Sequence, residues 1–168
     1  MNIVLRKWRI EDADALSFLA NNRKIADKLR DRFPHPYTRQ DAVQWIGLQE
    51  AREPVTDFAV EAEGKLSGGC GLILQQDIYR CSAEIGYWVG EPYWGKGIAT
   101  AAVQKLVTYI SLTFPSVIRI YAEVFVNNNP SKRVLGKNGF SLESTRKKAV
   151  IKNNILLDDE VWVCLLHK

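Results

Sequence analysis

One stretch, Gly90–Thr100, constrains the fold of this chain more than any other, because it joins a strand-like run to a long helical pattern. The apolar run from Ala83 to Val89 precedes it, and the helical repeat from Ile98 to Phe114 follows it. Gly95 and Gly97 lie at the junction. Glycine turns backbone N–H groups inward at little steric cost, and a helix start adds unpaired N–H donors with roughly half a positive charge. The junction is therefore typical of a site for a phosphate or pyrophosphate.

The first turn of the expected helix carries no acidic side chain that would compete with such an anion. It contains Lys96, Ile98, Ala99 and Thr100, although a helix start usually recruits Asp or Glu. Short glycine patterns are common, however, and a tight turn that only caps the helix would explain the two glycines equally well. The junction alone leaves both interpretations open.

The composition indicates one domain, residues 1–168, with an ordinary core. Of the 168 residues, 46% are hydrophobic and 25% are charged, and the net charge is +4. There are three cysteines and no Cys-x-x-Cys pair, so we expect no disulfide framework, no zinc site, and a reducing, cytoplasmic compartment. Neither a secretory signal nor an apolar run of roughly 18 residues is visible, so no membrane contact is expected.

Hydrophobic periodicity predicts strands and helices that mingle along the chain, which favours an α+β fold with a mixed sheet. Strands are expected at Ile3–Trp8, Asp57–Glu61, Lys65–Gln75, Ser82–Val89, Ile118–Val124, Ser141–Lys148 and Ile155–Leu166. Helices are expected at Glu11–Asn22, Ile25–Leu29, Thr38–Gln49, Ile98–Phe114 and Asn129–Asn138. Glu63-Gly64 is expected to form a hairpin turn, and the last two strands are expected to join through Lys152–Asn154.

The helix after Asn128 has clear end signals. Asn129 is a good N-cap, Pro130 suits the first helical position, and Gly139 followed by Phe140 is typical of a left-handed C-terminal cap. If Asn129 caps the helix, the side chain of Asn128 is available for a ligand.

Two nucleotide-related interpretations fit less well. Gly90-x4-Gly95-Lys96 approaches the Walker A pattern, but Gly97 replaces the Ser or Thr that would reach magnesium, so an NTPase is disfavoured. An RNA-binding domain would rest only on the net charge of +4. The segment around Lys96 lacks the aromatic residues of an RNA-recognition strand, so no direct nucleic-acid binding is expected.

Three phrases together resemble the GNAT N-acetyltransferase superfamily, and more closely its ribosomal-protein N-terminal acetyltransferase (RimJ/RimL-like) branch. They are Ala-Glu-Ile-Gly-Tyr-Trp-Val from Ala83, Trp-Gly-Lys-Gly-Ile-Ala-Thr from Trp94, and Arg-Val-Leu-Gly-Lys-Asn-Gly-Phe from Arg133. The resemblance is strong from Ala83 to Phe140 and extends over the whole chain. It implies a mostly antiparallel mixed sheet of six to seven strands with about four to five helices, and splayed strands that form the cofactor cleft. It also implies acetyl-CoA as the acetyl donor, and no metal.

The resemblance further implies which residues hold the cofactor. The family's pyrophosphate motif, Gln/Arg-x-x-Gly-x-Gly/Ala, maps onto Trp94–Ala99, where Trp94 replaces the usual Gln or Arg and still supplies a backbone N–H. The strand around Val89 would pair with the pantetheine amides like an added strand, and Asn128 would hold the pantetheine arm. The expected cofactor-binding residues are Trp88, Val89, Gly90, Trp94, Gly95, Lys96, Gly97, Ile98, Ala99, Thr100, Asn128 and Lys137.

Ser131 and Glu84 are the expected catalytic residues. Many GNAT enzymes use a Tyr as the acid at the position of Leu135, and the resemblance to the ribosomal branch implies Ser131 as the substitute that protonates the leaving sulfur. Glu84 is the expected base, directly or through water. An ordinary Ser in a first helical turn, and a solvated or salt-bridged strand carboxylate, are the competing explanations.

The acceptor is less defined by the sequence. Freeing a Lys amine of its proton at pH 7 costs about 4–5 kcal/mol, whereas an α-amine costs about 1 kcal/mol, which favours a peptide or protein N-terminus. A small amine, such as a polyamine or amino sugar, and a non-catalytic acyl-CoA-binding module are the alternatives. By family analogy, His35 and Tyr37 would contact the acceptor. A homodimer is compatible with the resemblance.

Overall fold

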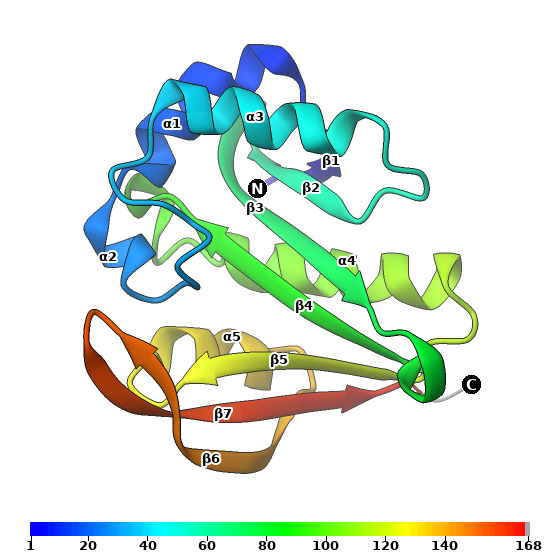
Figure 1. Ribbon diagram of the computed structural model, residues 1–168. Helices are drawn as coiled ribbons and strands as arrows, with labels where there is room; N and C mark the ends of the chain where they lie inside the picture. Colours follow the sequence, from blue (N-terminus) through cyan, green and yellow to red (C-terminus); the bar gives the residue numbers. More distant parts are fainter. Residues whose placement is uncertain (167–168) are drawn as a thin grey trace. The chain divides into compact units, whose positions relative to one another are not determined.

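The computed structural model describes residues 1–166 and shows an α+β fold with seven strands in one mixed sheet (Figure 1). The strand order is β1-β2-β3-β4-β5-β7-β6. The pairs β1–β2, β2–β3, β5–β7 and β6–β7 are antiparallel, whereas β4 and β5 are parallel. The predicted fold class is therefore confirmed. Two units, interleaved in the sequence, make up the chain, and each is described by itself.

The first unit contains residues 1–71 and 87–102. Its strands are β1 (Ile3–Arg6), β2 (Asp57–Ala62) and most of β3 (Lys65–Leu74). Its helical segments are η1 (Ile10–Asp12), α1 (Ala13–Ala20), α2 (Arg23–Ala26), α3 (Arg39–Glu50) and η3 (Glu91–Tyr93). Helices α1 and α3 lie side by side and pack against each other (Figure 1).

Local sequence signals explain the ends of several elements in this unit. The Thr38 hydroxyl accepts the backbone N–H of Asp41 at 3.1 Å, and the Asp41 carboxylate accepts the backbone N–H of Thr38 at 2.7 Å, so α3 begins with the predicted capping box. Glu63 and Gly64 have φ values of 49° and 75°, which confirms the predicted hairpin turn between β2 and β3. The predicted first helix is divided, since a 3-10 turn precedes α1.

The core of the first unit lies between its two longer helices and its strands. Leu16 of α1 and Ile46 of α3 are almost fully buried, and they belong to one cluster with Trp8. Gly69 of β3 lets two indoles approach, because a Cβ at this position would lie 2.9 Å from Trp88 Nε1 and 3.0 Å from Trp8 Cζ2. The indoles of Trp8 and Trp88 therefore pack directly against the backbone of β3 at Gly69.

The second unit contains residues 72–86 and those from 103 onward. Its elements are η2 (Asp77–Tyr79), the first part of β4 (Ser82–Val89), most of α4 (Ile98–Thr113), β5 (Arg119–Phe125), α5 (Asn129–Lys137), β6 (Ser141–Lys152) and β7 (Ile155–Leu165). The parallel register pairs Ser82–Glu84 with Arg119–Tyr121, at the amino-terminal ends of both strands. Val103, Leu106 and Ile110 form the fully buried face of α4, as their helical spacing predicts.

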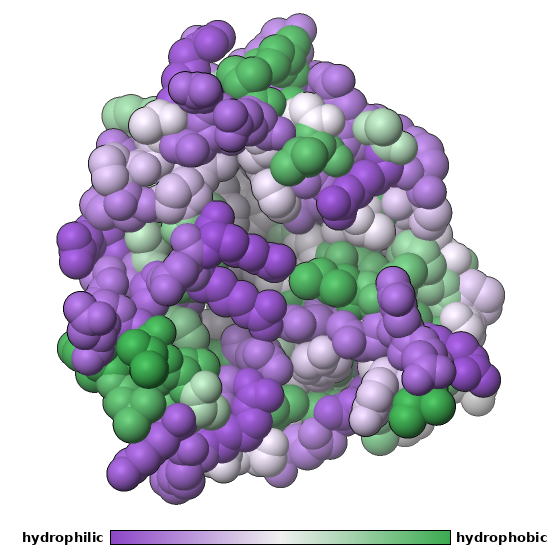
Figure 2. All heavy atoms as spheres, viewed as in Figure 1, coloured by the Kyte–Doolittle hydropathy of each residue, from purple (hydrophilic) through white to green (hydrophobic). Residues whose placement is uncertain are grey.

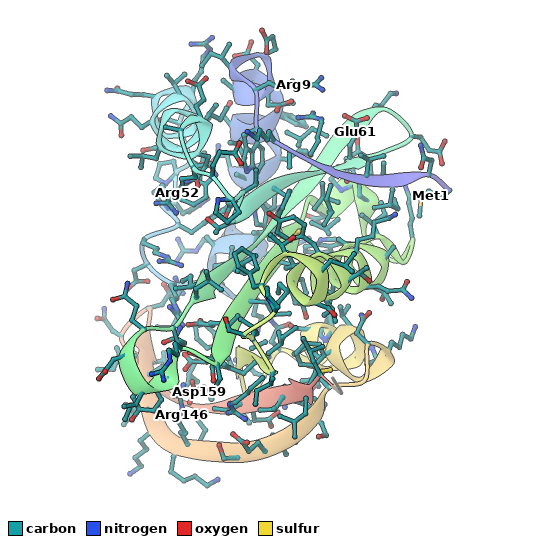
Figure 3. All side chains as sticks on the ribbon, turned by 90° about the vertical axis from the view of Figure 1, so that its right-hand side faces the viewer. Met1, Arg9, Arg52, Glu61, Arg146 and Asp159 are labelled. Atoms are coloured by element: carbon teal, nitrogen blue, oxygen red, sulfur yellow. The ribbon has the colours of Figure 1, made fainter. Side chains whose placement is uncertain are left out.

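An ion-pair network fixes β6 to its neighbours. Arg146 of β6 binds the carboxylate of Asp159 through two nitrogens, one of them Nε at 2.9 Å, and its Nη1 lies 3.0 Å from Glu123 Oε1. Figure 3 shows Arg146 and Asp159 meeting between the two strands. Because Asp159 is only 2% exposed, its charge needs this partner.

The β6–β7 hairpin is longer than the sequence predicts. The prediction ended the first strand at Lys148, but this residue has a φ of 51° and lies within a register shift, after which β6 continues to Lys152. Positive φ values at Asn153 and Asn154 form the predicted turn. Ile151 and Ile155 beside the turn are 68% and 60% exposed, and Figure 2 shows a hydrophobic patch over this hairpin. Within residues 1–166, no helix has the length and hydrophobicity needed to cross a membrane.

Candidate active site

The junction between β4 and α4 forms a cradle of backbone amides, residues Gly95–Ala99, in the first unit. Gly95 and Gly97 have φ values of 74° and 76°, the left-handed region that favours glycine. A Cβ at either glycine would meet no protein atom within 4 Å, so the space beside them is open. The first turn of α4 carries no acidic residue, as the sequence predicts.

The cradle presents consecutive N–H donors. Within residues 1–166, the backbone N–H groups of Gly95, Lys96, Gly97, Ile98 and Ala99 donate to no protein acceptor. Further into the helix, the Ala101 N–H donates to the Gly97 carbonyl at 3.0 Å. Unpaired amides at a helix start, with no carboxylate among them, suit a multiply charged anion such as a diphosphate.

Trp94 departs from the prediction that its N–H joins the cradle. Its backbone N–H donates to the Glu91 carbonyl at 3.1 Å, and its indole N–H donates to the Val89 carbonyl at 2.6 Å. Both N–H groups of Trp94 therefore bind carbonyls of the same loop, and the amides without a protein acceptor begin at Gly95. The replacement of a polar side chain by Trp94 gives the loop an internal brace.

The backbone N–H and carbonyl of Gly90 both have partners within the first unit. Its N–H donates to the Ser67 carbonyl at 2.8 Å, and its own carbonyl accepts the N–H of Tyr93 at 2.9 Å. A Cβ here would lie 2.7 Å from Leu19 Cδ2, so a larger residue would require the Leu19 side chain to move. Gly90 therefore anchors the loop, and the cofactor contacts at Trp88, Val89 and Gly90 stay predictions.

The side chain of Lys96 braces the same loop. Its ammonium donates to the Pro92 carbonyl at 2.9 Å and lies 5.5 Å from the centre of the Tyr93 ring, within range of a cation–π contact. The positive charge is thus held beside the amides. Thr100 is half-buried in α4, and Lys137 is an exposed residue at the end of α5. Their cofactor roles remain predictions.

Asn128, and not Asn129, caps α5. The Asn128 side-chain oxygen accepts the backbone N–H of Ser131 at 3.4 Å, and Asn129 is the first helical residue. The prediction was one residue late because both asparagines suit a cap and Pro130 is acceptable at the second helical position as well as the first. The carbonyl side of the Asn128 amide is therefore engaged, and a ligand contact would fall to its NH₂ group.

Ser131, Leu135 and Glu84 all belong to the second unit. Ser131 is half-buried in the first turn of α5, while Leu135, at the position that the resemblance assigns to a tyrosine acid, is fully buried. Glu84 is half-buried on β4, opposite Tyr121 in the parallel register. Paired residues in neighbouring strands share a face of the sheet, and Glu123 lies two residues beyond Tyr121 on that face. The carboxylates of Glu84 and Glu123 therefore occupy one face.

The two predicted acceptor contacts have different surroundings. His35 is exposed and precedes Pro36, to which it is joined by a cis peptide bond. Tyr37 is 7% exposed and packs against Phe33, with ring centroids 5.1 Å apart. Burial raises the pKa of Tyr37 to about 12. Tyr37 is therefore a buried residue of the first unit, and its contact with the acceptor stays a prediction.

Two residues near these elements were missed by sequence reasoning. Glu91 accepts hydrogen bonds from Asn22 and Lys24, which lower its pKa. Asp57, at the start of β2, accepts the Trp8 indole N–H at 2.9 Å, and burial raises its pKa to about 7. The sequence offers one signal for the first, since Glu91 is the only acid between residues 90 and 100. Nothing in the pattern around Asp57 indicates its burial.

Comparisons with known proteins identify the family. The model of the acetyltransferase (GNAT) domain matches residues 2–141. An uncharacterised N-acetyltransferase, p20 of Bacillus licheniformis, is 32% identical over 84% of this chain and 80% of its own length. The putative ribosomal N-acetyltransferase YdaF of Bacillus subtilis is 30% identical over 99% of this chain and 92% of its own length.

A solved structure supports the same assignment. The microcin C7 self-immunity acetyltransferase MccE, solved with acetyl-CoA and AMP, is 25% identical, with a TM-score of 0.84 over 98% of this chain and 92% of that chain. The amide cradle of this chain has the chemistry that a coenzyme A diphosphate requires. The chain belongs to the GNAT family of acetyl-CoA-dependent N-acetyltransferases.

Proposed function

We propose that this enzyme transfers the acetyl group of acetyl-CoA to the N-terminal α-amine of a protein or peptide. The observation that carries the proposal is the run of five amides at Gly95–Ala99 that find no acceptor within residues 1–166. The name of YdaF, a putative ribosomal N-acetyltransferase, supports this class of acceptor. The free thiols Cys70, Cys81 and Cys164 support a reducing, cytoplasmic setting.

In this proposal the cradle binds the diphosphate of acetyl-CoA. Hydrogen bonds to charged groups contribute about 1.5–3 kcal/mol each, so two or three of the five donors would contribute about 3–9 kcal/mol, against about 8 kcal/mol for a micromolar affinity. Lys96, held on the Pro92 carbonyl, adds a positive charge beside the anion. Asn128, through its NH₂ group, and the β4 residues Trp88 and Val89 would hold the pantetheine arm.

The proposed chemistry uses one acid and one base. The neutral amine nitrogen bonds to the thioester carbonyl carbon, and the carbon–sulfur bond breaks when the tetrahedral intermediate collapses. Glu84 accepts the proton that the amine nitrogen loses, directly or through water, and the Ser131 hydroxyl donates a proton to the leaving sulfur. Water then carries the proton from Glu84 to Ser131, which restores both groups. The half-buried positions of both side chains are compatible with contact to a substrate and with exchange of protons with water.

The choice of an α-amine follows from the weak acid and base that the proposed site contains. Leu135 is fully buried, so no phenol acts at the position of the usual tyrosine. An α-amine needs about 1 kcal/mol to lose its proton at pH 7, against about 4–5 kcal/mol for a Lys side chain. A site with a hydroxyl as its acid is therefore better matched to the α-amine.

The test is an acceptor screen with isotopically labelled acetyl-CoA. One set of peptides has a free α-amine and acetylated lysines, and a matched set has a blocked α-amine and free lysines. Mass spectrometry should place the label on the N-terminal nitrogen of the first set. Label only on lysines, or only on polyamines and amino sugars added in parallel, would refute the proposed acceptor.

A further inference from the structure

Glu91 links the entrance of the amide cradle to the α1–α2 region within the first unit. Its carboxylate accepts a hydrogen bond from Asn22 Nδ2 at 2.6 Å and another from the ammonium of Lys24. The side chains of Lys24 and Glu91 are 66% and 38% exposed, so water reaches this ion pair. Burial does not account for these contacts, which join residues almost seventy positions apart in the sequence.

Asn22 serves both partners at once. Its side-chain oxygen accepts the backbone N–H of Lys24 at 2.9 Å and so caps α2, while its NH₂ group binds Glu91. The beginning of α2 and the side chain of Glu91 are therefore held by the two ends of one amide. A displacement of Glu91 would disturb the cap from which the segment 22–37 starts.

The backbone of Glu91 sets the start of the cradle. Its carbonyl accepts the N–H of Trp94 at 3.1 Å, and Trp94 directly precedes Gly95, the first free donor. Gly90, on the other side of Glu91, is fixed by Ser67 and packed against Leu19. The position of Glu91 is thus transmitted along a single turn, η3, to the amides.

We propose that Glu91 is a positioning residue that couples the cradle, Gly95–Ala99, to the segment 22–37, so that coenzyme A binding orders both. The proposal rests on the proposed function, because it takes the cradle as the diphosphate site. It goes further by assigning a role to Glu91, which lies outside the proposed catalytic and cofactor-binding residues. Segment 22–37 contains His35, so the coupling would make the cofactor influence acceptor binding.

Electrostatic repulsion alone and the positioning role predict opposite changes in coenzyme A affinity for Glu91→Gln. Glu91 carries a negative charge near a site for an anion, so Glu91→Gln should tighten coenzyme A binding if repulsion were its only effect. If Glu91 positions the cradle, the same substitution should weaken binding about two- to fivefold, since an exposed charge-assisted contact is lost. Lys24→Met should weaken binding under both views, and Lys24→Arg should restore it.

The experiment measures hydrogen exchange by mass spectrometry and binding by calorimetry, with coenzyme A as the probe. In the wild-type enzyme, coenzyme A should slow exchange at residues 95–100 and also at residues 22–37. Glu91→Gln should keep the first effect at saturating coenzyme A and lose the second. Asp14→Asn is the matched control, because it removes another exposed ion pair of this unit, the one with Arg39 at 2.6 Å. Asp14 and Arg39 are not among the side chains that bind the Glu91 carboxylate, which are Asn22 and Lys24.

The outcomes separate the two proposals. If wild-type residues 95–100 gain no protection, the cradle is not the diphosphate site and the proposed function fails. If they gain protection while residues 22–37 do not, or if Glu91→Gln binds coenzyme A as well as or better than wild type with both effects intact, the coupling is refuted. Equal behaviour of Asp14→Asn and Glu91→Gln would also refute it.

Discussion

Replacement of Gly97 by valine tests the geometry of the cradle most sharply. Gly97 has a φ of 76°, and a β-branched residue is a genuine outlier in that region. The left-handed conformation costs an ordinary residue about 1–2 kcal/mol, and more for valine, so the loop of Gly97→Val should relax. Part of the binding free energy of coenzyme A must then be used to return the amides to their original geometry. Since 1.4 kcal/mol corresponds to a factor of ten, the dissociation constant should rise at least about 5- to 30-fold.

Gly64→Val is the matched control. Gly64 has a φ of 75°, also has open space where a Cβ would be, and lies in the β2–β3 turn of the same unit. It should lose a similar amount of stability in thermal unfolding, but calorimetry should give wild-type affinity for coenzyme A. Wild-type affinity in Gly97→Val, or an equal loss of affinity in both variants, would refute the reasoning.

Three further predictions concern the proposed acid and base and one buried carboxyl. Ser131→Ala should lower kcat about 100-fold or more while the dissociation constant of coenzyme A stays unchanged, and unchanged turnover would exclude Ser131 as the acid. Glu84→Gln should move the rise of the pH–rate profile to higher pH, because the amine must then lose its proton to solvent; an unmoved profile would contradict the role of the base. Asp57 has a pKa raised by burial to about 7, so its ionisation costs stability as pH rises from about 4 to 7, and Asp57→Asn should gain more than about 1 kcal/mol over wild type at pH 8 but not at pH 4. Parallel denaturant titrations at both pH values check this, and an equal difference at the two would contradict it.

Strong local signals made most elements predictable. β4 begins and ends at the predicted residues, and α4 ends one residue early, because hydrophobic periodicity and flanking glycines define both. The helix and strand ends that differed from the prediction lie where more than one residue suits the same role. Asn128 and Asn129 both suit a cap, and only the folded backbone decides between them. The bulge at Lys148 looks like a strand end in the sequence, because tertiary pairing resumes the strand beyond it.

The site was predictable where backbone conformation follows from residue type, and less so where partners come from distant segments. Gly95 and Gly97 show the positive φ that their positions suggested. The engagement of Gly90 by Ser67, the burial of Tyr37 and the contacts of Glu91 with Asn22 all join residues far apart in sequence. A single sequence carries no direct signal for such contacts.

The central claim is that the amides of Gly95–Ala99 bind the coenzyme A diphosphate. Amide chemical shifts followed by two-dimensional NMR during titration with coenzyme A test it most directly. The account predicts the largest shifts, in the direction of stronger hydrogen bonding, at these five residues, and a reduced response in Gly97→Val. Saturation of the enzyme with coenzyme A while these five amides stay unshifted would contradict it.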